Sequence, residues 1–243
     1  MDIGNATYGH WQCLGWTKEF DSSFIILNSS FTTLMLTDLT VKDFLNKVAG
    51  SDPVPGGGSI AALNGALASA LAAMVANLTI GKKKYAEVQE DMQAIAQEAE
   101  RLLGDFTADI DRDSDAYDRV FACFKMPKET DEEKAARSAA IQEATKYAAQ
   151  VPLEVARRAC ALMPRVAEVA LKGNQNAVTD ACVAMMSARN AVLAAVLNVR
   201  INLSSLKDAE LVTRLQAEAD GLEQQACQQE QALLNKVKAL LQA

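Results

Sequence analysis

A loop rich in proline and glycine leads directly into a long run of small apolar residues, PVPGGGSIAALNGALASALAAMVANLT, at positions 53–79. A run of about 21 residues, at about 1.5 Å rise per residue, is long enough to cross a membrane core of about 30 Å. However, much of the run is Ala, Ser, Gly and Asn, which drive membrane insertion only weakly. A phosphate-binding loop of the form GxxxxGK[ST] needs a lysine, which GGGSIAAL lacks. The run therefore favours a helix buried inside a protein.

The glycines ahead of this run bear on function as well as on folding. Glycines that lead into a helix leave backbone N–H groups unpaired at its positive end, where they can hold an anionic or carbonyl group. Gly56, Gly57, Gly58 and Ser59 are therefore candidate ligand contacts. The alternative is a tight turn in which Ser59 only caps the helix.

Composition indicates an all-α protein. Half of the residues are apolar but only 5% are aromatic, and alanine, the best helix former, dominates. A second run of small apolar residues occupies positions 177–203. We predict a helical bundle with two buried Ala-rich helices and long charged outer helices.

Capping signals and prolines predict where the other helices begin and end. Thr40 caps a short helix that stops at Gly50, and a long amphipathic helix follows over 82–126 with Gly104 as a weak point. Thr130 and Glu133 start another helix, which Pro152 should kink and Pro164 should stop or restart. The charged tail over 209–243 completes the bundle.

The first 34 residues differ in kind from the rest. They contain both tryptophans, the only histidine and a stretch rich in Ser, Thr and Asn. Helical patterning begins after Met35, so we expect residues 1–34 to be a poorly ordered or non-native extension and residues 35–243 to be one helical domain.

Charge and cysteine content limit the class of protein. A net charge of −7 without a cationic cluster argues against nucleic acid as a partner. Five scattered cysteines without a CxxC pair are typical of a reducing, cytoplasmic compartment. Because His10 is the only histidine and lies in the extension, we expect catalysis to use carboxylates, lysine, hydroxyls or backbone dipoles, and we expect no metal site.

An acidic cluster, DIDRDSD, contains Asp111 and Asp113. It does not continue as a calcium-binding loop, because neither register places glycine and glutamate where such a loop needs them. On a helix these two side chains point about 200° apart, so they cannot both face one pocket unless the helix is deformed or a partner subunit contributes. A solvated charged face is the alternative.

Other polar residues are weaker candidates. Lys128 and Arg137 beside a turn could contact anions or be ordinary surface charge, and Asn174 and Asp180 near a helix start could serve as caps. Asn198 and Asn202 lie four residues apart on an apolar helix and indicate either a polar network between helices or a ligand contact.

Taken together, PGGGS, D-x-D, MPKETDEEKAAR, GN…TD and NVRINL occur in an order that resembles the cyclodeaminase family over about residues 36–208. This family comprises the C-terminal part of the bifunctional formiminotransferase-cyclodeaminase and free-standing bacterial proteins. The resemblance implies a helical homodimer that closes 5-formiminotetrahydrofolate to 5,10-methenyltetrahydrofolate and releases ammonia. Some relatives instead hydrolyse the methenyl compound. No tightly bound cofactor is implied, and a separate formiminotransferase could supply the substrate.

The resemblance also suggests roles for the candidates. Asp111 or Asp113, with Asp180 as the rival, would be the acid-base group. The glycine loop and Ser59 would approach the pterin, and Lys128 and Arg137 would meet the glutamate carboxylates. Asn174, Asn198 and Asn202 would form hydrogen bonds with the donors and acceptors of the pterin. A helical module that only oligomerises or binds folate is the competing class.

Overall fold

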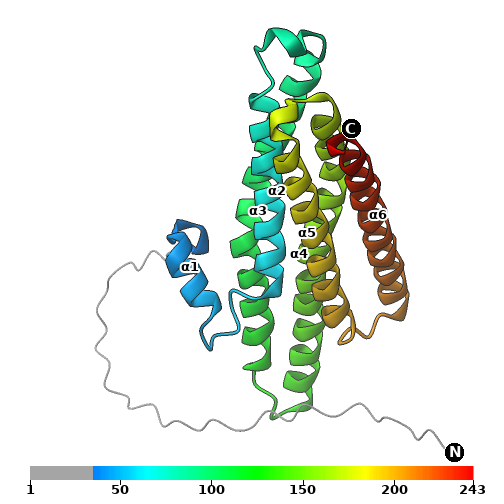
Figure 1. The fold of residues 1–243 in the computed structure, drawn as a ribbon. Coiled ribbons are helices and arrows are strands. Elements are labelled where there is room, and N and C mark those ends of the chain that lie inside the picture. The colour runs from blue at the N-terminus through cyan, green and yellow to red at the C-terminus, as the bar shows by residue number, and fades with distance from the viewer. Residues whose placement is uncertain (1–34, 243) are drawn as a thin grey trace, which may run out of the picture. The chain divides into compact units, whose positions relative to one another are not determined.

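A computed structural model describes residues 35–242, and within this range the chain is helical without strands. Figure 1 shows long helices side by side, with the C-terminal helix along their outer side. The helices are α1 (Val41–Val48), α2 (Gly57–Asn77), α3 (Gln89–Phe124), α4 (Asp131–Lys172), α5 (Val178–Leu203) and α6 (Ala209–Leu241); three short 3-10 turns are η1 (Leu36–Asp38), η2 (Lys83–Val88) and η3 (Gln175–Ala177). The all-α bundle is thus confirmed. The expectation for residues 1–34 lies outside the described residues.

The two Ala-rich helices, α2 and α5, lie next to each other, and each buries twelve residues in the bundle. Small side chains allow close approach between helices, which is clearest at Gly65, where a Cβ would overlap the buried ring of Phe106 from α3. Both helices are long and apolar enough to span a membrane, but 61% and 50% of their apolar windows are buried inside the bundle. Burial in the core therefore accounts for part of their apolar composition.

The predicted helix starts are confirmed by capping contacts. The hydroxyl of Thr40 accepts a hydrogen bond from the Asp43 N–H and begins α1. Thr130 and Glu133 form a reciprocal capping box at the start of α4. The long amphipathic helix begins later than predicted, since residues 83–88 form η2, and it continues through Gly104.

The prediction that Pro164 stops or restarts a helix is wrong. Helix α4 runs without interruption from Asp131 to Lys172 and contains both Pro152 and Pro164. Proline removes one backbone hydrogen bond, but here tertiary packing on both sides outweighs that loss: α4 buries a continuous series of side chains from Thr145 to Ala170 against its neighbours.

Candidate functional site

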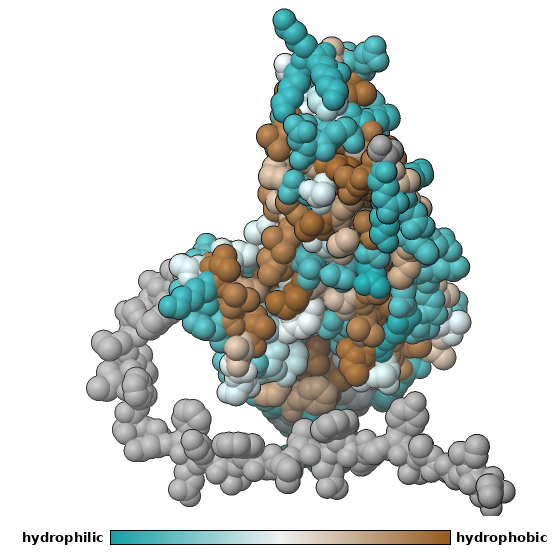
Figure 2. Space-filling model, viewed as in Figure 1, coloured by the Kyte–Doolittle hydropathy of each residue, from teal (hydrophilic) through white to brown (hydrophobic). Residues whose placement is uncertain are grey.

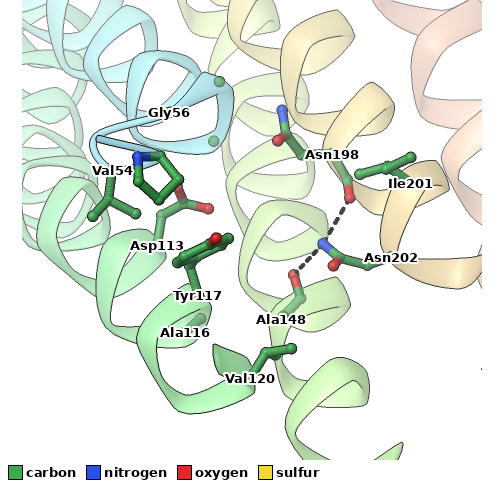
Figure 3. A pocket seen from close by; sticks show the side chains of 13 residues that line it. Val54, Gly56, Asp113, Ala116, Tyr117, Val120, Ala148, Asn198, Ile201 and Asn202 are labelled. Atoms are coloured by element: carbon green, nitrogen blue, oxygen red, sulfur yellow. Dashed lines mark hydrogen bonds between the residues drawn. The ribbon is translucent and has the colours of Figure 1, made fainter. Parts of the chain in front are cut away.

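A cavity of about 300 Å³ lies at the end of the bundle where α2 begins. The loop before α2 and the first turn of α2 form one wall, α3 and α4 form the second, and the end of α5 forms the third (Figure 3). The lining residues are Pro53, Val54, Gly56, Gly57, Gly58, Asp113, Ala116, Tyr117, Val120, Ala148, Asn198, Ile201 and Asn202.

The start of α2 brings unpaired backbone donors to this cavity. The N-cap Gly56 has no side chain, and the first intrahelical bond runs from the Ile60 N–H to the Gly56 oxygen at 3.1 Å. The N–H groups of Gly57 and Gly58 precede that bond, so they remain available at the positive end of the helix dipole. Both glycines line the cavity.

Asp113, from α3, lies directly against this helix start. A Cβ on Gly58 would overlap its carboxylate, so glycine is required for the close approach. The buried Ser59 hydroxyl lies 3.1 Å from Asp113 Oδ2 and 2.9 Å from the Ile110 carbonyl oxygen. A protonated Asp113 can donate to Ser59 Oγ while Ser59 donates to Ile110; an ionised Asp113 can accept from Ser59 instead.

Burial raises the pKa of Asp113 above its ordinary value of 3.8. Ser59 lowers the pKa through its hydroxyl and backbone N–H, and the negative charge of Asp109 raises it further, but burial is the largest effect. A carboxyl group that is buried beside a cavity and titrates above its usual range suits general acid-base chemistry.

Asn198 and Asn202 face Asp113 from α5, on the opposite side of the cavity (Figure 3). The Asn198 amide donates to the Ala194 oxygen at 2.8 Å. The Asn202 amide donates to the oxygens of Ala148 (3.0 Å) and Asn198 (2.9 Å). Two amide groups and one carboxyl group therefore surround the space, alongside the aromatic ring of Tyr117.

A family model for formiminotransferase-cyclodeaminase matches residues 40–221, which include every residue that lines this cavity. The chain belongs to the formiminotransferase-cyclodeaminase family. This is a family of enzymes of folate one-carbon metabolism.

Individual relatives of this family differ in name and in length. The chain is 44% identical, over 75% of its length and 88% of the relative, to methenyltetrahydrofolate cyclohydrolase of Methylorubrum extorquens. It is 31% identical to formimidoyltransferase-cyclodeaminase of Rattus norvegicus, of which it spans 38%. The crystal structure of formiminotetrahydrofolate cyclodeaminase from Thermotoga maritima superposes with a TM-score of 0.75 at 29% identity, covering 84% of this chain and 98% of that one.

The cavity is lined by several of the candidates from the sequence, and the Ser59 hydroxyl contacts Asp113 from behind. The lining candidates are Gly56, Gly57, Gly58, Asp113, Asn198 and Asn202. The lining does not include Asp111. The two carboxylate oxygens of Asp111 accept hydrogen bonds from the Leu36 N–H at 2.6 Å and the Thr37 hydroxyl at 3.0 Å. Asp111 therefore attaches the segment before α1 to α3, as expected from the opposite orientation of neighbouring aspartates on one helix.

Asp180 and Asn174 lie at the other end of the bundle from the cavity. Asp180 is in the first turn of α5, 18 residues before Asn198, which corresponds to about 27 Å along the helix axis. The buried Asn174 caps η3, donates its side-chain amide to the Leu78 oxygen at 3.2 Å, and donates its backbone N–H to Thr79 Oγ1 at 2.8 Å. These contacts join the end of α2 to the loop before α5.

Lys128 and Arg137 flank the turn between α3 and α4, outside the cavity lining. Lys128 is exposed. The Arg137 guanidinium donates to the Phe124 carbonyl oxygen at 3.1 Å and lies over the Phe124 ring, so it caps the end of α3.

Tyr117 and a cluster of ion pairs are polar features of the site that were not predicted from the sequence. Tyr117 lies one helical turn after Asp113, a spacing of four that places both on one face of α3. Beside the cavity, the buried Asp109 pairs with Arg112 and Arg158, which also contact Glu154. The spacing of four could have revealed Tyr117, whereas the ion pairs depend on how α3 meets α4.

Proposed function

We propose that this chain binds a tetrahydrofolate derivative in the cavity and acts on the single carbon held by nitrogens N5 and N10. The observation that carries the proposal is Asp113: its carboxyl group has a raised pKa, lies at a helix start with free N–H groups, and faces two asparagines across a cavity. Family membership supplies the class of substrate.

Hydrolysis of 5,10-methenyltetrahydrofolate is the first candidate, because the cyclohydrolase matches this chain at 44% identity against 31% for the rat bifunctional protein. Water adds to the cationic methenyl carbon while Asp113 removes one proton from the water. The tetrahedral intermediate then loses one carbon–nitrogen bond, and the nitrogen that leaves takes a proton from Asp113. The products are formyltetrahydrofolate and one proton.

Cyclodeamination is the second candidate, supported by the name of the Thermotoga maritima structure. N10 attacks the carbon of the protonated formimino group of 5-formiminotetrahydrofolate, and Asp113 takes the N10 proton. The same carboxyl group returns that proton to the formimino nitrogen, which leaves as ammonia. A separate formiminotransferase would supply this substrate. Both reactions move only protons at a carbon–nitrogen centre, so neither needs a resident cofactor or metal.

The cavity accounts for the pterin end of such a ligand. About 300 Å³ is at the lower limit of small-molecule sites, enough for a two-ring head but not for a whole folate. Gly57 and Gly58 would offer N–H groups to it, and Asn198 and Asn202 would pair with its polar edge. The glutamate end would extend out of the cavity, where Lys128 and Arg137 are the candidate cations.

We also propose that the protein is a homodimer formed through α2 and α5. Both helices are apolar on their outer side as well, and Figure 2 shows hydrophobic residues gathered over them on the viewed face. The exposed apolar side chains recur at spacings of three, four and seven, which is typical of a helix face that packs on a partner. They are Leu67 and Met74 on α2, and Val183, Met186, Leu197 and Ile201 on α5.

The methenyl absorbance band distinguishes the candidates. A cyclohydrolase makes the band of added 5,10-methenyltetrahydrofolate disappear faster than buffer does, whereas a cyclodeaminase makes the band appear from 5-formiminotetrahydrofolate with release of ammonia. A protein that binds folate and changes neither spectrum would be the non-catalytic module, and the proposal would be wrong.

We place the reaction in the cytoplasm, in keeping with four described cysteines that are free thiols; cell fractionation tests this.

A further inference from the structure

Pro152 leaves a backbone carbonyl of α4 without its helical donor. In an α-helix the oxygen of residue 148 accepts from the N–H of residue 152, and proline has no N–H. The side-chain amide of Asn202, from α5, donates to this Ala148 oxygen at 3.0 Å (Figure 3). Ala148 and Pro152 are both buried, and Asn202 is the donor that this oxygen has in place of the missing N–H.

The second amide hydrogen of Asn202 is used as well. It is donated to the Asn198 backbone oxygen at 2.9 Å. Both partners are carbonyl oxygens, which can only accept, so the orientation of the amide is fixed by chemistry. Only the side-chain oxygen, Oδ1, remains for a ligand.

We propose that Asn202 is a specificity-determining residue: the donor vacancy at Pro152 holds it as an obligatory hydrogen-bond acceptor, which selects ligands with an N–H donor at that point of the cavity. The inference rests on the proposed folate function, because the reduced pterin ring offers such donors at its 2-amino group, N3 and N8. Asn198 differs, since only one of its amide hydrogens is donated to Ala194 and it can present either a donor or an acceptor.

Thermal unfolding of the wild type and five variants tests the link between Pro152 and Asn202 without any ligand. Asn202→Ala should lower Tm by about 4 °C, because it leaves the buried Ala148 oxygen unpaired. In the Pro152→Ala background, Asn202→Ala should lower Tm by at most half as much. Alanine at position 152 restores a backbone N–H, which can then donate to the Ala148 oxygen. Pro164→Ala is the matched control: Pro164 is an exposed proline in the same helix, and in its background the full loss should persist. An equal loss in all three backgrounds would overturn the link.

Ligand binding tests the acceptor role, with the wild-type protein as the reference because the missing N–H at Pro152 is what holds Asn202 as an acceptor. The probes are tetrahydrofolate and three analogues that lack one donor each: 2-deamino-2-methyl, N3-methyl and 8-deaza. Calorimetry should show about tenfold weaker binding of at least one analogue, the loss expected for one hydrogen bond. In the Asn202→Ala variant, the ratio of the Kd of that analogue to the Kd of tetrahydrofolate should be close to one.

Two different failures are distinguishable in this experiment. If the reference protein binds tetrahydrofolate but Asn202→Ala changes none of the three ratios, the acceptor role is wrong while the folate function stands. If the wild-type protein does not bind tetrahydrofolate, the proposed function fails and the acceptor role fails with it. With substrate, the acceptor role also requires Asn202→Ala to raise KM much more than it lowers kcat.

Discussion

At the scale of single residues, two aspartates two positions apart have different surroundings. Asp111 accepts two hydrogen bonds from the segment before α1, whereas Asp113 is held against the start of α2 beside a cavity. The sequence predicted that they could not share a pocket, but not which of them faces it. That choice depends on where α2 crosses α3, which no local pattern encodes.

Asp113→Asn should lower turnover by about 10²–10⁴-fold, the usual contribution of a general acid-base group. Asp111→Asn is the matched control and should retain turnover. In the wild type, activity should fall as pH decreases through the raised pKa of Asp113, because the attacking group then has no base. Steady-state kinetics against pH measures both effects, and equal turnover of the two variants would contradict the role of Asp113.

The same raised pKa predicts how stability changes with pH. Because burial disfavours the charged carboxylate in the folded protein, the contribution of Asp113 to stability is present at low pH and is lost as pH rises through its folded-state pKa. Asp113→Asn should therefore be more stable than the wild type at neutral pH, and this advantage should vanish under acidic conditions. Urea denaturation across this pH range is the measurement.

At the scale of helices, periodicity and capping predicted most of the architecture. The caps at Thr40 and Thr130 are used as expected, since a cap depends on residues three positions apart. The effect of Pro164 was not predictable in the same way, because packing along the whole of α4 decides whether the helix survives it. The cavity forms where helices far apart in sequence meet. Val120 and Ala148 were therefore not predicted as lining residues, because nothing local distinguishes them from other apolar residues.

Glycine-to-alanine changes should be favourable for stability at one position in α3 and unfavourable for turnover at one position in α2. Gly104→Ala should raise the free energy of unfolding by about 0.5–1 kcal/mol, because Gly104 is exposed inside a continuous helix and a Cβ there meets nothing within 4 Å. Gly58→Ala should lower turnover by about 10²-fold, because its Cβ displaces the Asp113 carboxylate. Calorimetry and kinetics on the two variants test this contrast; a Gly58→Ala enzyme with wild-type turnover would contradict the close approach.

At the scale of the whole molecule, the apolar outer faces of α2 and α5 predict association between two copies. Leu67→Glu should shift the protein from dimer to monomer, because it places a charge within the proposed interface. Leu240→Glu is the matched control: Leu240 is similarly exposed, 55% against 49%, but lies on α6. Light scattering after gel filtration gives the mass of each variant, and an unchanged mass for Leu67→Glu would exclude this interface.

Ile201 belongs to two surfaces at once: it lines the cavity, and with 67% of its surface exposed it ends the apolar face of α5. If two copies pair through this face as proposed, the shared side chain would link substrate occupancy to subunit pairing. With positive coupling, each would strengthen the other by the same factor. Catalytic output per chain would then fall on dilution and recover when substrate is added in excess. Cellular abundance itself would thereby set how active each copy is.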